Sequence, residues 1–297
     1  MRITLRIILI LLGALGPLTI AFATAPAKTI LISDIDDTIK DTQVKPAALS
    51  IAATASQYWH MMTTILSSNN SFIGIPLIYT ALAANGVEIQ YVSGGIEFFR
   101  ALPEKFLQSS GFPKGRLWLR PNLSVKTEDF KLAQIQKIML SEPTANFIML
   151  GDNGEKDVTV YRKLKADPRF RNQIREVYIH HLYSNDIGEL LTSDQKPFLT
   201  AADLSIQLLE SGALTEGQTY QVLRTVEQGL SSQFQSIQRR TFPAFAPLDM
   251  SDLNQLKLSE NQVQNPTLRA LFRKIIKCLW LREPSTKTYC SGSFFSL

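Results

Sequence analysis

Three carboxylates follow a short apolar run near the start of the chain. Residues 28–34 have the composition of a buried strand, and Asp34, Asp36 and Asp37 stand at its end. Open α/β sheets place their chemistry at the carboxyl ends of their strands, so this position predicts a ligand crevice. Two carboxylates at this spacing can supply a nucleophile and a general acid/base, and their oxygens suit Mg²⁺. An acidic turn without chemistry is the alternative interpretation of this stretch alone.

A second pair of carboxylates follows another apolar run. Residues 146–151 have the composition of a strand, Asp152 comes directly after them, and Asp157 follows after four intervening residues. We expect Asp152 to face the same crevice as Asp34. A second carboxylate pair at a second strand end is what a six-coordinate Mg²⁺ site requires.

Two further positions have groups that suit a phosphate. Ser93 and the glycine after it, Gly94, follow the strand-like run 87–92, where a hydroxyl and backbone N–H groups can bind phosphate oxygens. Lys131 lies near the start of a predicted helix, which is electrostatically unfavourable unless an anion is close. Taken alone, the segment at Ser93 has an ordinary turn as its alternative, and Lys131 has a solvated surface lysine as its alternative.

Alternating strand-like and helix-like runs predict the domain that positions these groups. Between residues 28 and 181 they indicate an α/β domain with a largely parallel sheet. The expected strands are 28–34, 87–92, 116–119, 146–151 and 176–180, and the expected helices are near 75–84, 96–110, 129–141 and 156–165. The connection after the first strand is too long to be a simple loop, so we predict a small helical cap insert at about 43–72.

The strand signal fades after about residue 186. We predict helices at 201–213, 215–232 and 266–281, with an irregular connector from Thr241 to Met250. The last helix has one apolar face, and its arginines and lysines occupy the other. Two interpretations stay open: the helix lies on anionic lipid as a peripheral membrane contact, or it packs on the core of its own protein.

The order of these motifs resembles that of haloacid dehalogenase (HAD) superfamily phosphatases. The matching motifs are Asp34-x-Asp36-x-Thr38, Ser93, Lys131 and Gly151-Asp152-x4-Asp157. Residues 33–39, 91–93 and 151–157 are also similar to the phosphatidate phosphatase branch that is named for a yeast actin-patch protein and related to the lipins. The resemblance covers about residues 28–185. It implies an α/β, HAD-like Rossmannoid parallel sheet with a small helical cap insert and a helical C-terminal extension.

The resemblance also implies roles for the site residues. Asp34 would attack phosphorus, and Asp36 would act as general acid and base. Mg²⁺ would be the cofactor, and Asp157 would orient Lys131 or a metal-bound water. The implied metal-site residues are Asp34, Asp36 (through its backbone carbonyl), Asp152 and Asp157. The implied phosphate-binding residues are Ser93, Lys131, Gly94 and Thr38, the last of which also fixes the loop.

Phosphatidic acid is the favoured substrate, hydrolysed through an aspartyl-phosphate. A departure from that branch follows Ser93, where Gly94-Gly95-Ile96 replaces a small residue followed by Ser-Pro-Trp. One alternative is therefore a soluble HAD phosphomonoesterase or phosphotransferase, and another is a catalytically silent module that binds phosphatidic acid. The formal charge of +5, from 31 basic and 26 acidic residues, falls to +3 if Arg2 and Arg6 leave with a signal peptide. This mildly basic balance fits an anionic substrate or membrane surface, and we expect no nucleic-acid partner.

The first residues predict export. Arg2 and Arg6 precede an uncharged run that ends in small residues, which is typical of a secretory signal peptide at 1–25. We therefore expect a periplasmic or secreted protein, with an uncleaved N-terminal membrane anchor as the alternative. The predicted division is a signal peptide at 1–25, a catalytic domain at 26–185 and a mostly helical extension at 186–297.

The cysteines and histidines predict no zinc site. In an oxidising compartment Cys278 and Cys290 could form a disulfide, and the alternative is that Cys278 is a small buried apolar residue. His180 and His181 are adjacent, so on a strand they point to opposite faces and cannot bind one metal together.

Overall fold

The computed structural model describes residues 27–42, 70–183, 188–232, 234–242, 256 and 259–280. The predicted signal peptide at 1–25 lies outside the described residues, as does the predicted cap insert apart from residues 70–72. Both stay predictions. Among the described residues, no helix combines the length and apolar character that a membrane crossing needs.

Six parallel strands form one sheet in the described part of the chain. Their order across the sheet is β3-β2-β1-β4-β5-β6, and every neighbouring pair is parallel. The strands are β1 (Thr29–Ser33), β2 (Glu88–Ile96), β3 (Arg116–Arg120), β4 (Asn146–Asp152), β5 (Ile174–His180) and β6 (Lys196–Phe198). The sheet confirms the predicted α/β class. Because β1 lies between β2 and β4, the loops that carry the predicted motifs start beside one another.

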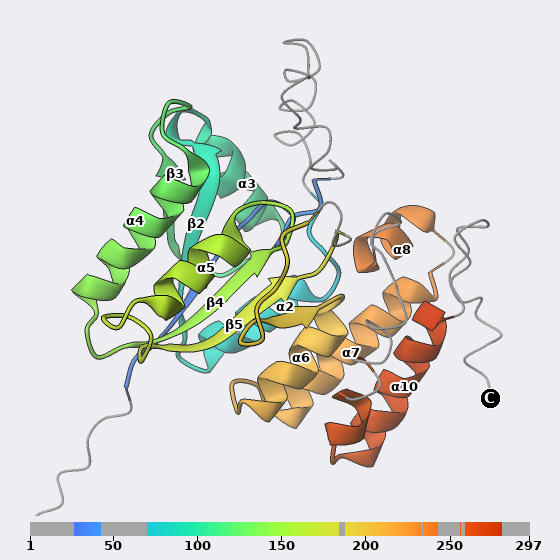
Figure 1. Ribbon diagram of the computed structural model, residues 1–297. Coiled ribbons are helices and arrows are strands. Elements are labelled where there is room, and N and C mark those ends of the chain that lie inside the picture. The colour runs from blue at the N-terminus through green and yellow to red at the C-terminus, as the bar shows by residue number, and fades with distance from the viewer. Residues whose placement is uncertain are drawn as a thin grey trace, which may run out of the picture.

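Helices cover both faces of this sheet (Figure 1). Those that follow β1 to β4 are α2 (Ile75–Ala84), α3 (Ala101–Ser109), α4 (Thr127–Ser141) and α5 (Asp157–Ala166). Successive residues of a strand point to opposite faces. Accordingly Ile30 and Ile32 pack in one core with α4 and α5, whereas Leu31 packs in a second core on the other side, with α2 and the C-terminal helices.

The C-terminal helices join the core on the α2 side. They are α6 (Ala201–Glu210), α7 (Glu216–Leu230), α8 (Gln235–Thr241) and α10 (Pro266–Trp280). The start of α10 at its proline is as predicted. The buried apolar residues of α10 are Leu268, Leu271, Phe272, Ile275, Ile276 and Leu279. The helix packs against α7 and α6, which agrees with the core-packing interpretation of its apolar face. Cys278 is buried, and Cys290 lies outside the described residues, so their pairing stays a prediction.

Several predicted boundaries differ from the structure. The strand expected at 87–92 continues through Gly94 and Gly95 to Ile96, with a shift of register against β3 between Ser93 and Ile96. Glycines tolerate such a bulge because they lack a Cβ. Helix α4 begins at Thr127, two residues earlier than expected, and its first turn has acidic residues that suit a helix N-terminus. Lys131 therefore stands in the second turn.

Two elements in the described part of the chain were not predicted. Strand β6 follows the point where the strand signal fades, and it has only three residues, one of them Pro197. Proline is tolerated in an edge strand, where one side of the backbone needs no partner. Helix α8 precedes the predicted connector and ends where that connector begins, at Thr241. The connector beyond residue 242 lies outside the described residues.

Candidate active site

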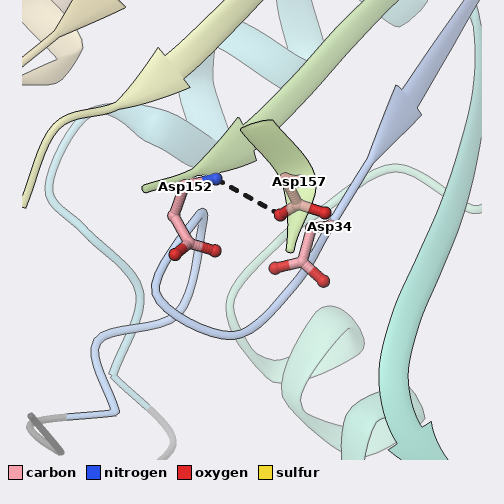
Figure 2. A group of neighbouring side chains, drawn as sticks. All are labelled: Asp34, Asp152 and Asp157. Carbon is pink, nitrogen blue, oxygen red and sulfur yellow. Dashed lines mark hydrogen bonds between the residues drawn. The ribbon is translucent and has the colours of Figure 1, made fainter. Parts of the chain in front are cut away.

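Three carboxylates gather where β1 and β4 end (Figure 2). Asp34 follows β1, Asp152 is the last residue of β4, and Asp157 is the first residue of α5. One oxygen from each lies within 4.8 Å of the others, and all three residues are buried. The Asp152 backbone N–H donates to Asp157 Oδ2 at 3.3 Å. The structure therefore brings together three of the four residues predicted for the metal site.

The fourth, Asp36, does not belong to this group of side chains. Its carboxylate is 22% exposed and forms an ion pair with Lys40, with 3.5 Å between Asp36 Oδ1 and Lys40 Nζ. It is still close enough to contribute to the raised pKa of Asp34. The prediction gave Asp36 a backbone role at the metal, which leaves its side chain for proton transfer.

Lys131 is a buried residue of the site rather than a solvated surface lysine. Its side chain is 1% exposed, and its ammonium donates to Asp34 Oδ1 at 2.8 Å and to Asp157 Oδ1 at 2.7 Å. Glu155 Oε2 lies 3.5 Å from the same nitrogen. Burial alone would lower the pKa of Lys131, but the carboxylates of Asp157 and Asp34 outweigh it and raise that pKa well above its usual range.

The balance of charge in this cluster fits a divalent cation. Burial raises the pKa of Asp34 well above its usual range despite the nearby ammonium of Lys131. Burial raises the pKa of Asp152 in the same way, and repulsion from Asp157 and Asp34 adds to it. One ammonium thus faces three buried carboxylates, and buried charge must be paired or must bind metal. Carboxylate oxygens are hard donors, which is the ligand type that Mg²⁺ prefers.

Hydrogen bonds hold the carboxylates in place. Thr38 Oγ1 donates to Asp34 Oδ2 at 3.0 Å and lies 3.4 Å from Asp152 Oδ2. Asp152 Oδ1 accepts from the backbone N–H groups of Gly154 at 2.6 Å and Glu155 at 3.0 Å. Thr38 therefore links the ends of two adjacent strands, as expected of a residue that fixes the loop.

Gly151 is needed for the close approach of β4 and α5. A Cβ at this position would lie 2.5 Å from Asp157 Cβ and 2.7 Å from its carboxyl carbon. Real Cβ atoms do not come so close, so a larger residue would displace Asp157. Glycine at 151 thus allows the Asp157 carboxylate to reach Lys131.

The predicted phosphate loop lies beside this cluster. Ser93 is buried, and its Oγ accepts from the Gly95 backbone N–H at 3.0 Å. A Cβ at Gly94 would lie 2.7 Å from Thr127 Cγ2 and 3.4 Å from Glu155 Oε2. Gly94 therefore faces the start of α4 and the same Glu155 that approaches Lys131. The end of β2 and the loop after β4 thus meet at Glu155, close to the ammonium of Lys131.

Sequence reasoning gave no role to several residues of this region. Glu155 lies inside a quoted motif, but its spacing alone does not reveal its approach to Lys131. Asp37 is buried, and burial raises its pKa to about 7. His180 is also buried, and its ring nitrogen Nδ1 donates to the Asp37 carbonyl at 3.0 Å. Their place near the carboxyl ends of β1, β4 and β5 was the signal that the sequence offered for this set.

Comparison with known proteins identifies relatives of this arrangement. Residues 29–181 match the family described as "Phosphatidate phosphatase APP1, catalytic domain". The chain is 29% identical over 177 residues to phosphatidate phosphatase APP1 of Saccharomyces cerevisiae. That alignment covers 56% of this chain and 28% of the yeast protein, so the chain matches well under half the length of this relative. The matched range contains all the carboxylates described above and Lys131.

Proposed function

This chain belongs to the family defined by the catalytic domain of phosphatidate phosphatase APP1, and from that premise we propose that it is a phosphoric monoester hydrolase acting on phosphatidic acid. The observation that supports the chemistry most directly is the buried Asp34, which contacts Lys131 and Thr38 through different oxygens. Two contacts of this kind fix the carboxylate for attack on phosphorus. The yeast relative is named for the same activity.

Asp34 would act as the nucleophile. One carboxylate oxygen forms a bond to phosphorus while the bond from phosphorus to the lipid alcohol breaks, which leaves an aspartyl-phosphate on Asp34. Water then attacks that phosphorus, releases phosphate and restores the carboxylate. Lys131 and the backbone N–H groups around Gly94 stabilise the charge on the transferring phosphoryl oxygens.

Asp36 would move the protons. It stands two residues after the nucleophile, and its carboxylate is partly exposed beside Lys40. In the first step it protonates the departing alcohol oxygen. In the second it accepts a proton from the attacking water. Both transfers involve the same carboxyl group, so the enzyme returns to its starting state.

Asp34, Asp152 and the backbone carbonyl of Asp36 would hold Mg²⁺. When bound, Mg²⁺ offsets the repulsion between the anionic carboxylate and the anionic phosphate. Asp157 accepts from both Lys131 and the Asp152 amide, so we assign it to orienting these two groups. The resulting site has two ligand side chains, one orienting carboxylate and one fixed ammonium.

An exposed aromatic side chain near the phosphate loop favours a lipid over a soluble substrate. Phe98 comes three residues after Gly95, is 85% exposed, and contacts the Phe99 ring edge to face at 5.0 Å. Leu123 is 54% exposed and follows β3, the strand next to β2. Large apolar groups left in water beside a site often mark a surface for apolar ligands. The predicted cap lies outside the described residues apart from residues 70–72.

Export by a signal peptide at 1–25 is part of the proposal, since it accounts for the charge and apolar pattern of those residues.

The silent lipid-binding alternative is disfavoured because such a module needs neither the nucleophile Asp34 nor the proton carrier Asp36. A soluble phosphomonoesterase is the second candidate, supported by the Gly94-Gly95-Ile96 departure.

Phosphate release separates these functions. The purified protein is assayed with phosphatidic acid micelles and with a soluble aryl phosphate, each with Mg²⁺, with EDTA and as the Asp34→Asn variant. Metal-dependent release from the lipid that is lost in the variant supports the proposal. Release from the aryl ester alone would retain the chemistry and reject the lipid. Lipid binding without release from either substrate would reject the enzyme.

A further inference from the structure

The backbone of Asp37 has an unusual conformation beside the proposed proton carrier. Its φ is +58°, the left-handed region that residues other than glycine seldom adopt. Such strain persists only where surrounding contacts hold it, and it concentrates at functional sites. Asp37 follows Asp36 directly, so its conformation sets the direction of the Asp36 carbonyl.

Residues at the end of β5 hold Asp37 in this conformation. The Tyr183 hydroxyl donates to Asp37 Oδ2 at 2.6 Å, and His180 holds the Asp37 carbonyl. The other carboxylate oxygen, Oδ1, accepts from the Thr42 hydroxyl at 2.5 Å and from the Thr42 backbone N–H at 3.2 Å. Asp37 is therefore fixed from its own loop by Thr42, from the end of β5 by His180, and from the segment after β5 by Tyr183.

Tyr183 also contacts the loop that follows β4. Asn153 Oδ1 accepts from the backbone N–H groups of Leu182 at 3.0 Å and Tyr183 at 3.1 Å. Asn153 Nδ2 donates to the Tyr183 carbonyl at 2.7 Å. The Tyr183 ring lies so close to Gly154 that any Cβ at 154 would collide with it. Tyr183 thus joins the loop of Asp34 and Asp36 to the loop of Asp152.

We propose that Tyr183 is a positioning residue that sets the spacing between these two acidic loops and, through it, the affinity of the site for Mg²⁺. The proposal rests on the proposed function only in taking Asp34 and Asp152 as ligands of one ion. Backbone pairing between β1 and β4 ends at the hydrogen bond from the Asp34 N–H to the Leu150 carbonyl, at 2.9 Å. Beyond it, Tyr183 is bonded to the β1 loop through its hydroxyl and to the β4 loop through its backbone.

Tyr183→Phe tests this role, because it removes the hydroxyl and keeps the ring against Gly154. We expect Mg²⁺ affinity, measured by titration calorimetry without substrate, to fall about tenfold, as for other groups that support metal ligands. The Mg²⁺ concentration for half-maximal activity should rise equally, and activity should return to the wild-type value at saturating Mg²⁺. Thr42→Val is the matched control, since it removes the other hydroxyl from the Asp37 carboxylate without touching the β4 loop. Its Mg²⁺ affinity should fall less than that of Tyr183→Phe, because the Thr42 backbone N–H still donates to Asp37 Oδ1 and the bonds of Tyr183 stay in place.

Asn153→Ala interrupts the same connection from the other end and leaves the Asp37 bonds intact. We expect it to weaken Mg²⁺ binding. A double variant with Tyr183→Phe should bind Mg²⁺ as tightly as the single variant that has the lower Mg²⁺ affinity, because both substitutions act through Tyr183. Thermal unfolding without Mg²⁺ identifies any variant that fails to fold, and Asn153→Ala then stands in for Tyr183→Phe. Equal losses in Tyr183→Phe and Thr42→Val, or unchanged affinity in Tyr183→Phe and Asn153→Ala, would overturn the proposal. Mg²⁺ binding by a wild type that releases no phosphate would reject the hydrolase and leave this test intact.

Discussion

Lys131 and Asp34 form a fully buried ion pair, with 2.8 Å between Lys131 Nζ and Asp34 Oδ1 and with each side chain 1% exposed. They come from α4 and from the end of β1, 97 residues apart. The pair places a positive charge against the proposed nucleophile. Because Asp157 binds the same ammonium, the three charges depend on one another.

Replacement of this ammonium should damage both activity and stability. Lys131→Gln leaves Asp34 and Asp157 without their counter-charge, and loss of one partner of a buried pair costs about 3–5 kcal/mol. We also expect kcat to fall by about 100-fold or more, because a donor to the phosphoryl oxygens is lost. Urea unfolding and steady-state kinetics measure the two effects. A double variant with Asp157→Asn should regain part of the stability but not the activity. A Lys131→Gln protein as active as the wild type would contradict the assignment.

Gly151→Ala should disturb the orienting carboxylate without changing any charge. The added Cβ meets Asp157, so we expect a loss of roughly 1–3 kcal/mol in the free energy of unfolding and a lower kcat. Gly86→Ala is no suitable control, because Gly86 has a φ of +86°. Gly217→Ala is suitable, since Gly217 lies in α7 with open space around it. Equal effects in the two alanine variants would show that packing against Asp157 is unimportant.

The exposed Phe98 should matter only for lipid substrates. Phe98→Ser removes an aromatic group that can enter the apolar region of a micelle or bilayer, so release of phosphate from phosphatidic acid should fall several-fold. Release from a soluble aryl phosphate should stay at the wild-type rate. Leu140→Ser, on the outer face of α4 with Leu140 62% exposed, controls for general loss of surface hydrophobicity. If the lipid rate is unchanged, Phe98 has no role in lipid recognition.

His180 should make stability depend on acid pH. Burial lowers its pKa from 6.5 to about 4, so the folded state favours the neutral ring. The stabilisation is complete above pH 6.5 and is lost as pH falls through 4, with a size on the order of 3 kcal/mol. His180→Asn, whose amide can still donate to the Asp37 carbonyl, should lose less stability between pH 6.5 and pH 4 than the wild type.

Asp37 and Asp203 have raised pKa values, about 7 and about 6, so their contribution to stability changes with pH in the opposite direction. Denaturant unfolding gives the free energy of unfolding at each pH. The difference in this quantity between variant and wild type therefore isolates the contribution of His180. A constant difference between pH 7 and pH 4 would contradict the prediction.

Much of the fold could be predicted because parallel strands have simple signatures. Alternating apolar runs located β1 and β4, and the order of motifs implied that Asp34 and Asp152 would meet at one edge. The same spacing could not show that Lys131 is buried, since a single lysine is normally solvated and only its contacts across the chain reveal otherwise. The positions of Asp37 and Tyr183 were equally hidden, because their bond joins residues 146 apart in sequence.

The central claim is that Asp34 is the nucleophile of a phosphatase, and trapping its phosphorylated form tests this most directly. The protein is mixed with phosphatidic acid and Mg²⁺, quenched in acid within the turnover time, digested and examined by mass spectrometry. We predict one phosphate on the peptide that contains Asp34, removed by hydroxylamine and missing from Asp34→Asn. Phosphate release without any such adduct, or an adduct that persists in Asp34→Asn, would contradict the account.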